Sequence, residues 1–123
     1  PKADIVFDRF HVMKNYSKAL SNQRRIEFRK SNKAGKELMK GTHYLVLKNA
    51  EKLDEKQTTK LHQLLAENAN LNTLYIMKEQ LQALWSSQSV ALMQDELEKW
   101  CQIADQSNML YLKKFAKSLR KHC

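Results

Sequence analysis

Residues 3–12 read Ala-Asp-Ile-Val-Phe-Asp-Arg-Phe-His-Val, and this stretch separates two kinds of structure. An apolar, partly β-branched run ends at Asp8, and a basic segment with helical spacing follows directly. β-branched and aromatic residues favour strands, and Asp favours the residue that precedes a helix. We therefore predict a short strand at residues 4–7 and a helix after Asp8. Because no later segment could pair with a lone strand, we expect residues 1–8 to be a core strand of a larger fold whose earlier part precedes Pro1.

The remaining chain is predicted to be helical. Its 123 residues include two Gly and one Pro, which leaves little of the punctuation that a β-rich fold needs. Apolar residues recur at three- and four-residue intervals in six segments. These segments cover residues 9–30, 36–48, 55–68, 70–85, 89–106 and 107–123. In the second, Gly41 and the β-branched Thr42 and Val46 leave a strand possible. The predicted fold class is all-α, a bundle of about five to six helices in a single domain, residues 1–123, with residues 9–123 as its helical part.

Helix starts and core positions follow from the same pattern. Asp54 and Gln57 have capping-box spacing, and Asn70, Ser89 and Ser107 are predicted to begin the last three helices. In the first helix, Phe10, Met13, Tyr16 and Leu20 are predicted to share the apolar side. We predict one core that contains Leu64, Leu74, Trp85, Leu97, Trp100 and Phe115.

Charge is concentrated at the two ends of the chain. The net charge is +9, but residues 1–48 hold twelve Lys and Arg against four Asp and Glu, and residues 107–123 hold five against none. Basic patches of this kind attract nucleic acid by releasing counterions from phosphates. An ordinary solvated helical surface would explain the same composition equally well. Two Cys and no apolar segment of the roughly 20 residues that a membrane span needs lead us to expect a cytoplasmic protein with no membrane partner.

Several motifs resemble one family. They are residues 3–14, Ala-Asp-Ile-Val-Phe-Asp-Arg-Phe-His-Val-Met-Lys; the pair Arg24-Arg25; residues 38–49, Leu-x-Lys-Gly-x-x-Tyr-Leu-x-Leu-Lys-Asn; and residues 64–71, Leu-Leu-x-x-Asn-x-x-Leu. Together they resemble transposases of bacterial insertion sequences of the ISL type, and the resemblance covers essentially the whole chain.

The resemblance implies a DDE-class enzyme for DNA recombination. In that class a ribonuclease H-like fold holds three carboxylates that bind two divalent metals, Mg²⁺ or Mn²⁺, for DNA cleavage and strand transfer. The family's first two catalytic aspartates lie upstream of the segment that matches residues 5–11, and its third acidic residue lies beyond the helices. The chain would then be one core strand and a helical insertion domain, with no catalytic residue and no metal site of its own. We expect it to be inactive alone.

Asp8 and His11 resemble the Cys/Asp-x-x-His signature of related DDE transposases, which lies near the active site. The same spacing is explained if Asp8 caps the first helix and the backbone N–H of His11 donates to that cap. Both roles remain open.

DNA contact is predicted on and just after the first helix. The five residues are Arg24, Arg25, Arg29, Lys30 and Lys33, with Arg25, Arg29 and Lys33 at helical intervals of four. The expected partner is transposon-end DNA, with a homodimer possible. The alternative is a non-enzymatic helical module for dimerisation or partner binding, whose basic surface is incidental.

Overall fold

The computed structural model describes residues 8–87 and 89–121. Within these residues it has seven α-helices, two short 3₁₀ helices and no strand. In chain order they are α2 (Arg9–Lys30), α3 (Lys33–Met39), α4 (His43–Leu47), η1 (Ala50–Lys52), α5 (Glu55–Glu67), α6 (Ala69–Ala83), η2 (Leu84–Ser86), α7 (Val90–Asp105) and α8 (Leu110–Lys121). The all-α prediction is confirmed for this part of the chain. The predicted strand at residues 4–7 lies outside the described residues, so the strand and its ribonuclease H-like origin stay predictions.

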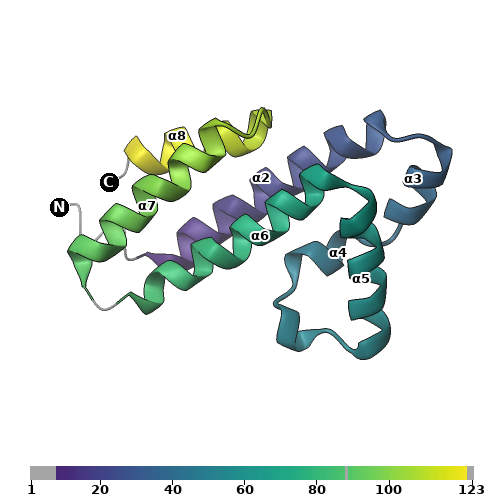
Figure 1. The fold of residues 1–123 in the computed structure, drawn as a ribbon, viewed down its shortest axis with the longest axis horizontal. Coiled ribbons are helices and arrows are strands. Elements are labelled where there is room, and N and C mark those ends of the chain that lie inside the picture. Colours follow the sequence, from purple (N-terminus) through teal and green to yellow (C-terminus); the bar gives the residue numbers. More distant parts are fainter. Residues whose placement is uncertain (1–7, 88, 122–123) are drawn as a thin grey trace.

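The helices form two regions (Figure 1). The long helices α2, α6, α7 and α8 pack in a ring in which α2 contacts α6 and α8, and α7 contacts the same two helices. We call these four helices the bundle. A lobe at the end of the bundle away from the N and C labels is formed by α3, α4, η1 and α5. One continuous set of buried apolar residues connects the bundle with the lobe.

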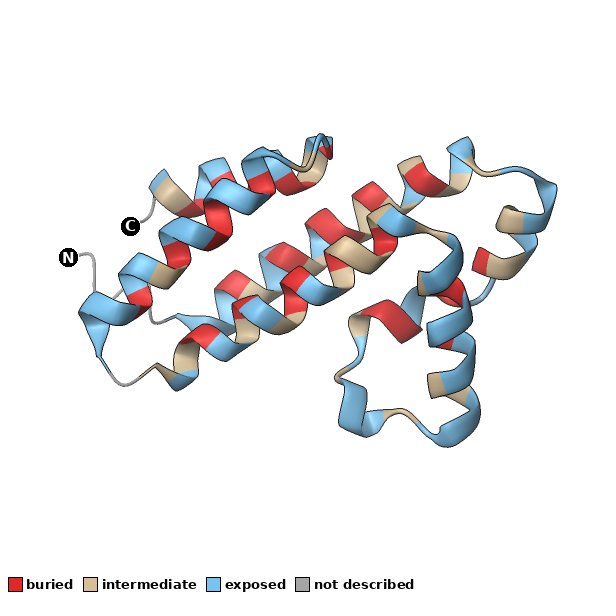
Figure 2. Cartoon of the chain, viewed as in Figure 1, coloured by how far each residue is buried: buried red, intermediate tan, exposed pale blue. Residues whose placement is uncertain are grey.

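Three aromatic rings form the centre of the bundle. Tyr16, Trp100 and Phe115 come from α2, α7 and α8, and each pair makes an edge-to-face contact with ring centroids 5.2–5.9 Å apart. Their polar atoms are satisfied, because the Tyr16 hydroxyl donates to the Leu74 carbonyl at 2.6 Å and the Trp100 indole donates to the Met77 carbonyl at 2.9 Å. Figure 2 shows the buried positions on the inward sides of these helices. The apolar core of the bundle therefore also contains defined ring contacts and hydrogen bonds.

The predicted core residues are mostly buried in the structure. Leu64, Leu74, Leu97, Trp100 and Phe115 are buried, and Trp85 is half-buried and packs against the same cluster. The predicted position of Phe10 is wrong, because 76 % of that residue is exposed. Tyr16 and Leu20 do face the core, and Val12 and Ala19 are the other buried apolar residues of α2.

The prediction of a single helix at residues 36–48 is wrong. Gly41 has φ +69°, a left-handed conformation that glycine adopts without steric cost and that ends the helical path. The chain leaves α3 at Met39 and re-enters a helix at His43. The Thr42 hydroxyl donates to the Met39 carbonyl at 2.6 Å, which satisfies one of the groups that the break exposes.

Two of the later predicted helix starts are confirmed. Asp54 and Gln57 form a complete capping box, in which the Gln57 N–H donates to Asp54 Oδ1 at 2.7 Å and the Asp54 N–H donates to Gln57 Oε1 at 3.0 Å. Ser89 precedes α7 and accepts from the Leu92 N–H at 3.1 Å.

Two other predicted starts are wrong. Asn68, not Asn70, caps α6, and the Asn70 side chain instead donates to the buried Glu27 carboxylate at 3.1 Å. Ser107 does not begin α8, which starts at Leu110. The Ser107 hydroxyl instead donates to the Ala104 carbonyl in the last turn of α7 at 2.7 Å.

Candidate nucleic-acid interface

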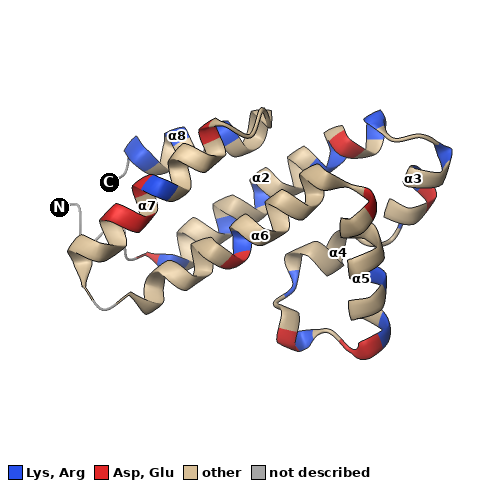
Figure 3. Ribbon diagram, viewed as in Figure 1, with Lys and Arg blue, Asp and Glu red and all other residues tan. Residues whose placement is uncertain are grey.

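The outer face of α2 carries a row of cations. A helix turns 100° per residue, so Lys14, Lys18, Arg25 and Arg29 lie on the side opposite Tyr16 and the other buried residues of α2. All four are exposed. The row spans about 22 Å, since its ends are fifteen residue steps apart and each step adds about 1.5 Å. Basic positions along α2 are visible in Figure 3. We call these four residues the α2 row.

The carboxylate within α2 is turned away from this row. Glu27 is 5 % exposed and lies against α6. Its carboxylate accepts from Asn70 Nδ2 at 3.1 Å and from Gln23 Nε2 at 3.4 Å. The Lys30 ammonium lies 3.7 Å from the same oxygen. Because these groups hold Glu27 inward, the solvent face of α2 presents positive charge without a neighbouring negative charge from its own helix.

Arg24 is not part of the exposed row. Its guanidinium turns toward the lobe, where Nη2 donates to the Met39 carbonyl at the end of α3 at 2.8 Å. Burial, and then the charge of neighbouring Arg25, lowers the pKa of Arg24. This arginine therefore joins α2 to α3 and is poorly placed for a phosphate.

The remaining predicted DNA-binding residues divide into two groups. Arg25 and Arg29 are exposed on α2, with Arg25 Nη1 donating to the Asn22 side chain at 2.7 Å. Lys30 is exposed but pairs with Glu27, and Lys33 belongs to α3. The helix ends at Lys30 because Ser31 is extended, with ψ 151°. The predicted helical row Arg25, Arg29, Lys33 is thus wrong at its third member.

Sequence reasoning missed Lys14 and Lys18. They are four residues apart, and Lys18, Arg25 and Arg29 continue at intervals of seven and four, which is helical periodicity. The signal was present, but the first half of this helix was interpreted from its apolar residues alone. The structure places these two lysines with Arg25 and Arg29 on one face.

Asp8 and His11 form a contact at the start of α2. Asp8 Oδ1 accepts the His11 backbone N–H at 3.1 Å, and Asp8 Oδ2 lies 2.6 Å from His11 Nδ1. The backbone bond and then the imidazole contact lower the pKa of Asp8. The predicted cap is confirmed. The His11 imidazole is exposed. Because Asp8 holds its Nδ1 atom, the other ring nitrogen, Nε2, is left to face solvent.

Neither a metal site nor a membrane-spanning helix is found in the described part of the chain. No group of three or more His, Cys, Asp or Glu residues there is placed to hold a metal ion. Among residues 8–87 and 89–121, no helix is long and apolar enough to cross a bilayer. Trp100 is 3 % exposed, so its ring belongs to the core.

Comparison with known proteins places this chain in a family. The family model described as transposase, DDE_Tnp_ISL3, matches residues 1–123. The chain belongs to the ISL3-type transposase family. This confirms the resemblance drawn from residues 3–14 and 38–49.

A curated relative of this ISL3-type chain is the transposase for insertion sequence element IS1001 of Bordetella parapertussis. The two sequences are 30% identical over 123 aligned residues. The alignment covers 98% of this chain and 30% of that protein. The chain thus spans about 30% of the length of the curated relative it matches. No solved structure matches it significantly.

Proposed function

We propose that this chain is the helical part of a DNA transposase and that the α2 row binds the phosphate backbone of transposon-end DNA. The observation that carries the proposal is the exposed row itself, Lys14, Lys18, Arg25 and Arg29, on a helix whose carboxylate is buried. Family membership supplies the choice of DNA as the anionic partner.

The physics of such a row favours binding that tolerates different sequences. Like charges at helical intervals of four repel by a few tenths of a kcal/mol per pair, and bound phosphates would relieve that repulsion. Phosphate contacts fix position on a duplex without reading bases. Each neutralised phosphate adds about 0.9 to the slope of log K against log salt. Binding should therefore be modest in affinity and should weaken steeply as salt rises.

A salt titration of duplex binding tests this proposal. The variant Arg25→Gln with Arg29→Gln should lower the slope by up to about two, and Lys14→Gln with Lys18→Gln should do the same. A matched control is Lys56→Gln with Lys60→Gln, which removes two exposed cations from α5. The control should leave most of the slope intact, because its charges are not on the α2 row.

Circular dichroism provides the check that every variant keeps its helices. Equal slopes for the wild type, both α2 variants and the control would remove the α2 row from the interface. That result would leave the non-enzymatic interaction module as the better interpretation. A chain that binds no duplex at any salt concentration would also contradict the proposal.

Catalysis by the complete enzyme is proposed to depend on carboxylates outside this chain. Two divalent metals, Mg²⁺ or Mn²⁺, would activate the attacking oxygen and stabilise the leaving oxygen. The described residues do not fit such a site, since they contain no suitable cluster of ligands. We assign no catalytic residue within the chain.

The chain alone should consequently leave DNA uncut. Incubating it with Mg²⁺ or Mn²⁺ and a labelled transposon-end duplex should yield no cleavage and no strand transfer. Cleavage that requires the metal and is abolished by Asp8→Ala would show that a metal site lies within the chain, and the assignment would be wrong.

Asp8 and His11 are proposed to lie near the active site of the complete transposase. The support is an exposed imidazole that a carboxylate orients through Nδ1 at 2.6 Å. Replacing His11 with Gln in the complete enzyme should slow DNA cleavage without changing binding of transposon ends. An unchanged cleavage rate would leave the pair as a helix cap.

A further inference from the structure

Helix α8 has an outer face that the α2 row does not include. Its inner side buries Leu112, Phe115, Ala116 and Leu119 against the bundle. Its outer side carries four exposed lysines, Lys113, Lys114, Lys117 and Lys121. No acidic residue occurs within α8. The helix is therefore apolar on its inner side, and all the charged residues on its outer side are basic.

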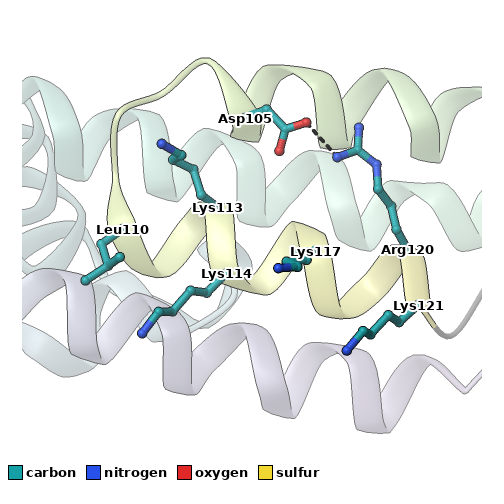
Figure 4. Close-up of a pocket in the computed structure, with 7 residues that line it drawn as sticks. All are labelled: Asp105, Leu110, Lys113, Lys114, Lys117, Arg120 and Lys121. Carbon is teal, nitrogen blue, oxygen red and sulfur yellow. Dashed lines mark hydrogen bonds and ion pairs between the residues drawn. The ribbon is translucent and has the colours of Figure 1, made fainter.

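Three of these lysines follow one line along the helix. Lys114, Lys117 and Lys121 are spaced by three and four residues, so neighbouring Cβ atoms lie about 5–6 Å apart. They line a shallow hollow together with Leu110 and Lys113 (Figure 4). In that view Lys114 and Lys121 extend toward α2, and Lys113 extends toward the α7 side.

The nearby carboxylates are already paired. Arg120 donates to Glu98 at 2.8 and 3.3 Å and to Asp105 at 2.6 Å. Asp105 borders the hollow, and its charge is met by this arginine (Figure 4). Arg120 thus ties α8 to α7, and its single positive charge is shared between Glu98 and Asp105.

The lysines themselves lack anionic partners within the described part of the chain. No ion pair there involves Lys113, Lys117 or Lys121, and the Lys114 ammonium lies 5.4 Å from the Tyr111 ring centroid. Four ammonium groups within little more than two turns repel one another in the free protein. An extended anion along the helix would remove this repulsion.

We propose that the outer face of α8 is a second phosphate-binding surface, which takes the backbone of a DNA duplex. The choice of DNA rests on the proposed function, whereas the surface is independent of the α2 row. The two helices are neighbours, since the Tyr111 N–H donates to Gln23 Oε1 at 3.0 Å and the Phe115 ring contacts Tyr16. Tyr111, near the start of α8, thus meets the later half of α2, and Phe115, farther along α8, meets the first half, so the two helices run antiparallel.

A membrane surface fits this face less well than DNA does. An amphipathic helix binds a bilayer by burying its apolar side among the lipids. The apolar side of α8 is already buried against α2 and α7. Leu110, 50 % exposed, is its one exposed large hydrophobic residue among those described. Only the positive charge of α8 remains available for binding, and a polyanion such as DNA complements that charge.

The test compares two variants that lose the same charge. The α8 variant loses three cations through Lys114→Gln, Lys117→Gln and Lys121→Gln. The lobe variant loses three exposed cations through Lys52→Gln, Lys56→Gln and Lys60→Gln. In salt titrations of duplex binding by the 123-residue chain, the α8 variant should lower the slope by up to about 2.7. The lobe variant should change it much less.

A second measurement does not depend on substitutions. Acetylation of lysines, read by mass spectrometry with and without duplex DNA, should show protection of Lys114, Lys117 and Lys121 relative to Lys52, Lys56 and Lys60. Equal protection of both sets would overturn the proposal. It would also be overturned if the α8 and lobe variants had equal slopes.

The two proposals fail in different ways. If the α2 variants lower the slope and the α8 variant does not, the α8 surface is wrong and the proposed function stands. If the chain binds no duplex, both are wrong. Stronger binding of the chain to phosphatidylserine vesicles than to duplex, lost in the α8 variant, would assign the surface to lipid and overturn the DNA assignment.

Discussion

The bundle is stabilised by the packing of its own long helices, whereas the short helices of the lobe depend on contacts from outside the lobe. Bundle helices contain 12 to 22 residues and bury one side of each helix around the Tyr16, Trp100 and Phe115 rings. Two of the lobe helices, α3 and α4, contain seven and five residues. Helices this short are unstable by themselves, because nucleation is costly and few hydrogen bonds repay it. The lobe must therefore gain its order from outside.

Two cations on bundle helices supply part of that order. Arg24 of α2 donates to the Met39 carbonyl at the end of α3. Lys78 of α6, 2 % exposed, donates to the Val46 carbonyl at 2.9 Å and the Lys48 carbonyl at 2.7 Å, beside the end of α4. The last carbonyls of a helix lack partners within it, and a nearby cation satisfies both their hydrogen bonding and the helix dipole. A basic residue of this chain is thus not necessarily available to DNA.

The largest effect should come from the centre of the bundle. Trp100→Ala removes a ring that contacts two others and the hydrogen bond to the Met77 carbonyl. Truncating a buried Trp typically costs roughly 3–5 kcal/mol, a large part of the total stability of a domain this size. Unfolding in urea, followed by circular dichroism, should show this loss of stability as a shift of the whole unfolding transition.

Ile103→Ala is the matched control for this prediction. Ile103 lies on the same helix, but 48 % of it is exposed, so its loss should change stability by less than about 0.5 kcal/mol. If Trp100→Ala and Ile103→Ala were equally mild, the aromatic centre would not be what holds the bundle together.

The bundle could be predicted from sequence because its signals are local. Apolar periodicity gave the four long helices, and side-chain caps at Asp8 and Ser89 were recognised from the residue before each helix. In the lobe, α5 and its capping box were predicted in the same way. The separation of α3 from α4 was not, because it depends on one left-handed glycine, Gly41, and on hydrogen bonds from distant helices. Nothing in the local sequence indicates that the Lys78 ammonium reaches the Val46 and Lys48 carbonyls.

The candidate site shows the same limit. Arg25 and Arg29 were predicted from the density of basic residues and are exposed. Composition gave no sign that Arg24 turns inward or that Glu27 is buried, because both outcomes depend on partners from α3 and α6. Local spacing predicts which residues share a helix face, whereas tertiary contacts decide which of them remain free.

The next largest effect should separate the lobe from the bundle. Lys78→Met keeps the length of the side chain but leaves the Val46 and Lys48 carbonyls without their donor. An unsatisfied buried carbonyl costs about 1–3 kcal/mol. Hydrogen exchange should accelerate in α4 and η1 and stay nearly unchanged in α7 and α8. Uniform acceleration across the chain would show that the two regions unfold as one unit.

Lys78 also predicts a pH dependence of stability. Burial lowers the pKa of Lys78 below its ordinary value of 10.5. Between the lowered pKa and 10.5 the unfolded chain therefore binds more protons than the folded one, so the Lys78 contribution to stability rises with pH in that window. A neutral amine still has two N–H groups for the two carbonyls. Subtracting the pH profile of Lys78→Met from that of the wild type should reveal this rise.

The smallest effects should distinguish two adjacent arginines of α2. Arg24→Gln removes the bond to the Met39 carbonyl, and Arg24 Nε is buried without a partner, which offsets part of the gain from that bond. We expect a loss of about 1 kcal/mol, with little change in the salt dependence of DNA binding. Arg25→Gln should do the reverse. Its stability should stay within about 0.5 kcal/mol of the wild type, while the salt slope falls by about 0.9.

These two variants lose the same charge one residue apart, so each is the control for the other. Urea unfolding measures the first property, and duplex binding at several salt concentrations measures the second. If both variants lowered the salt slope equally, net charge alone would govern DNA binding and the inward position of Arg24 would be irrelevant to it. If neither changed stability, the bond from Arg24 to Met39 would not order the lobe, and the apolar contacts of Met39 would have to do so.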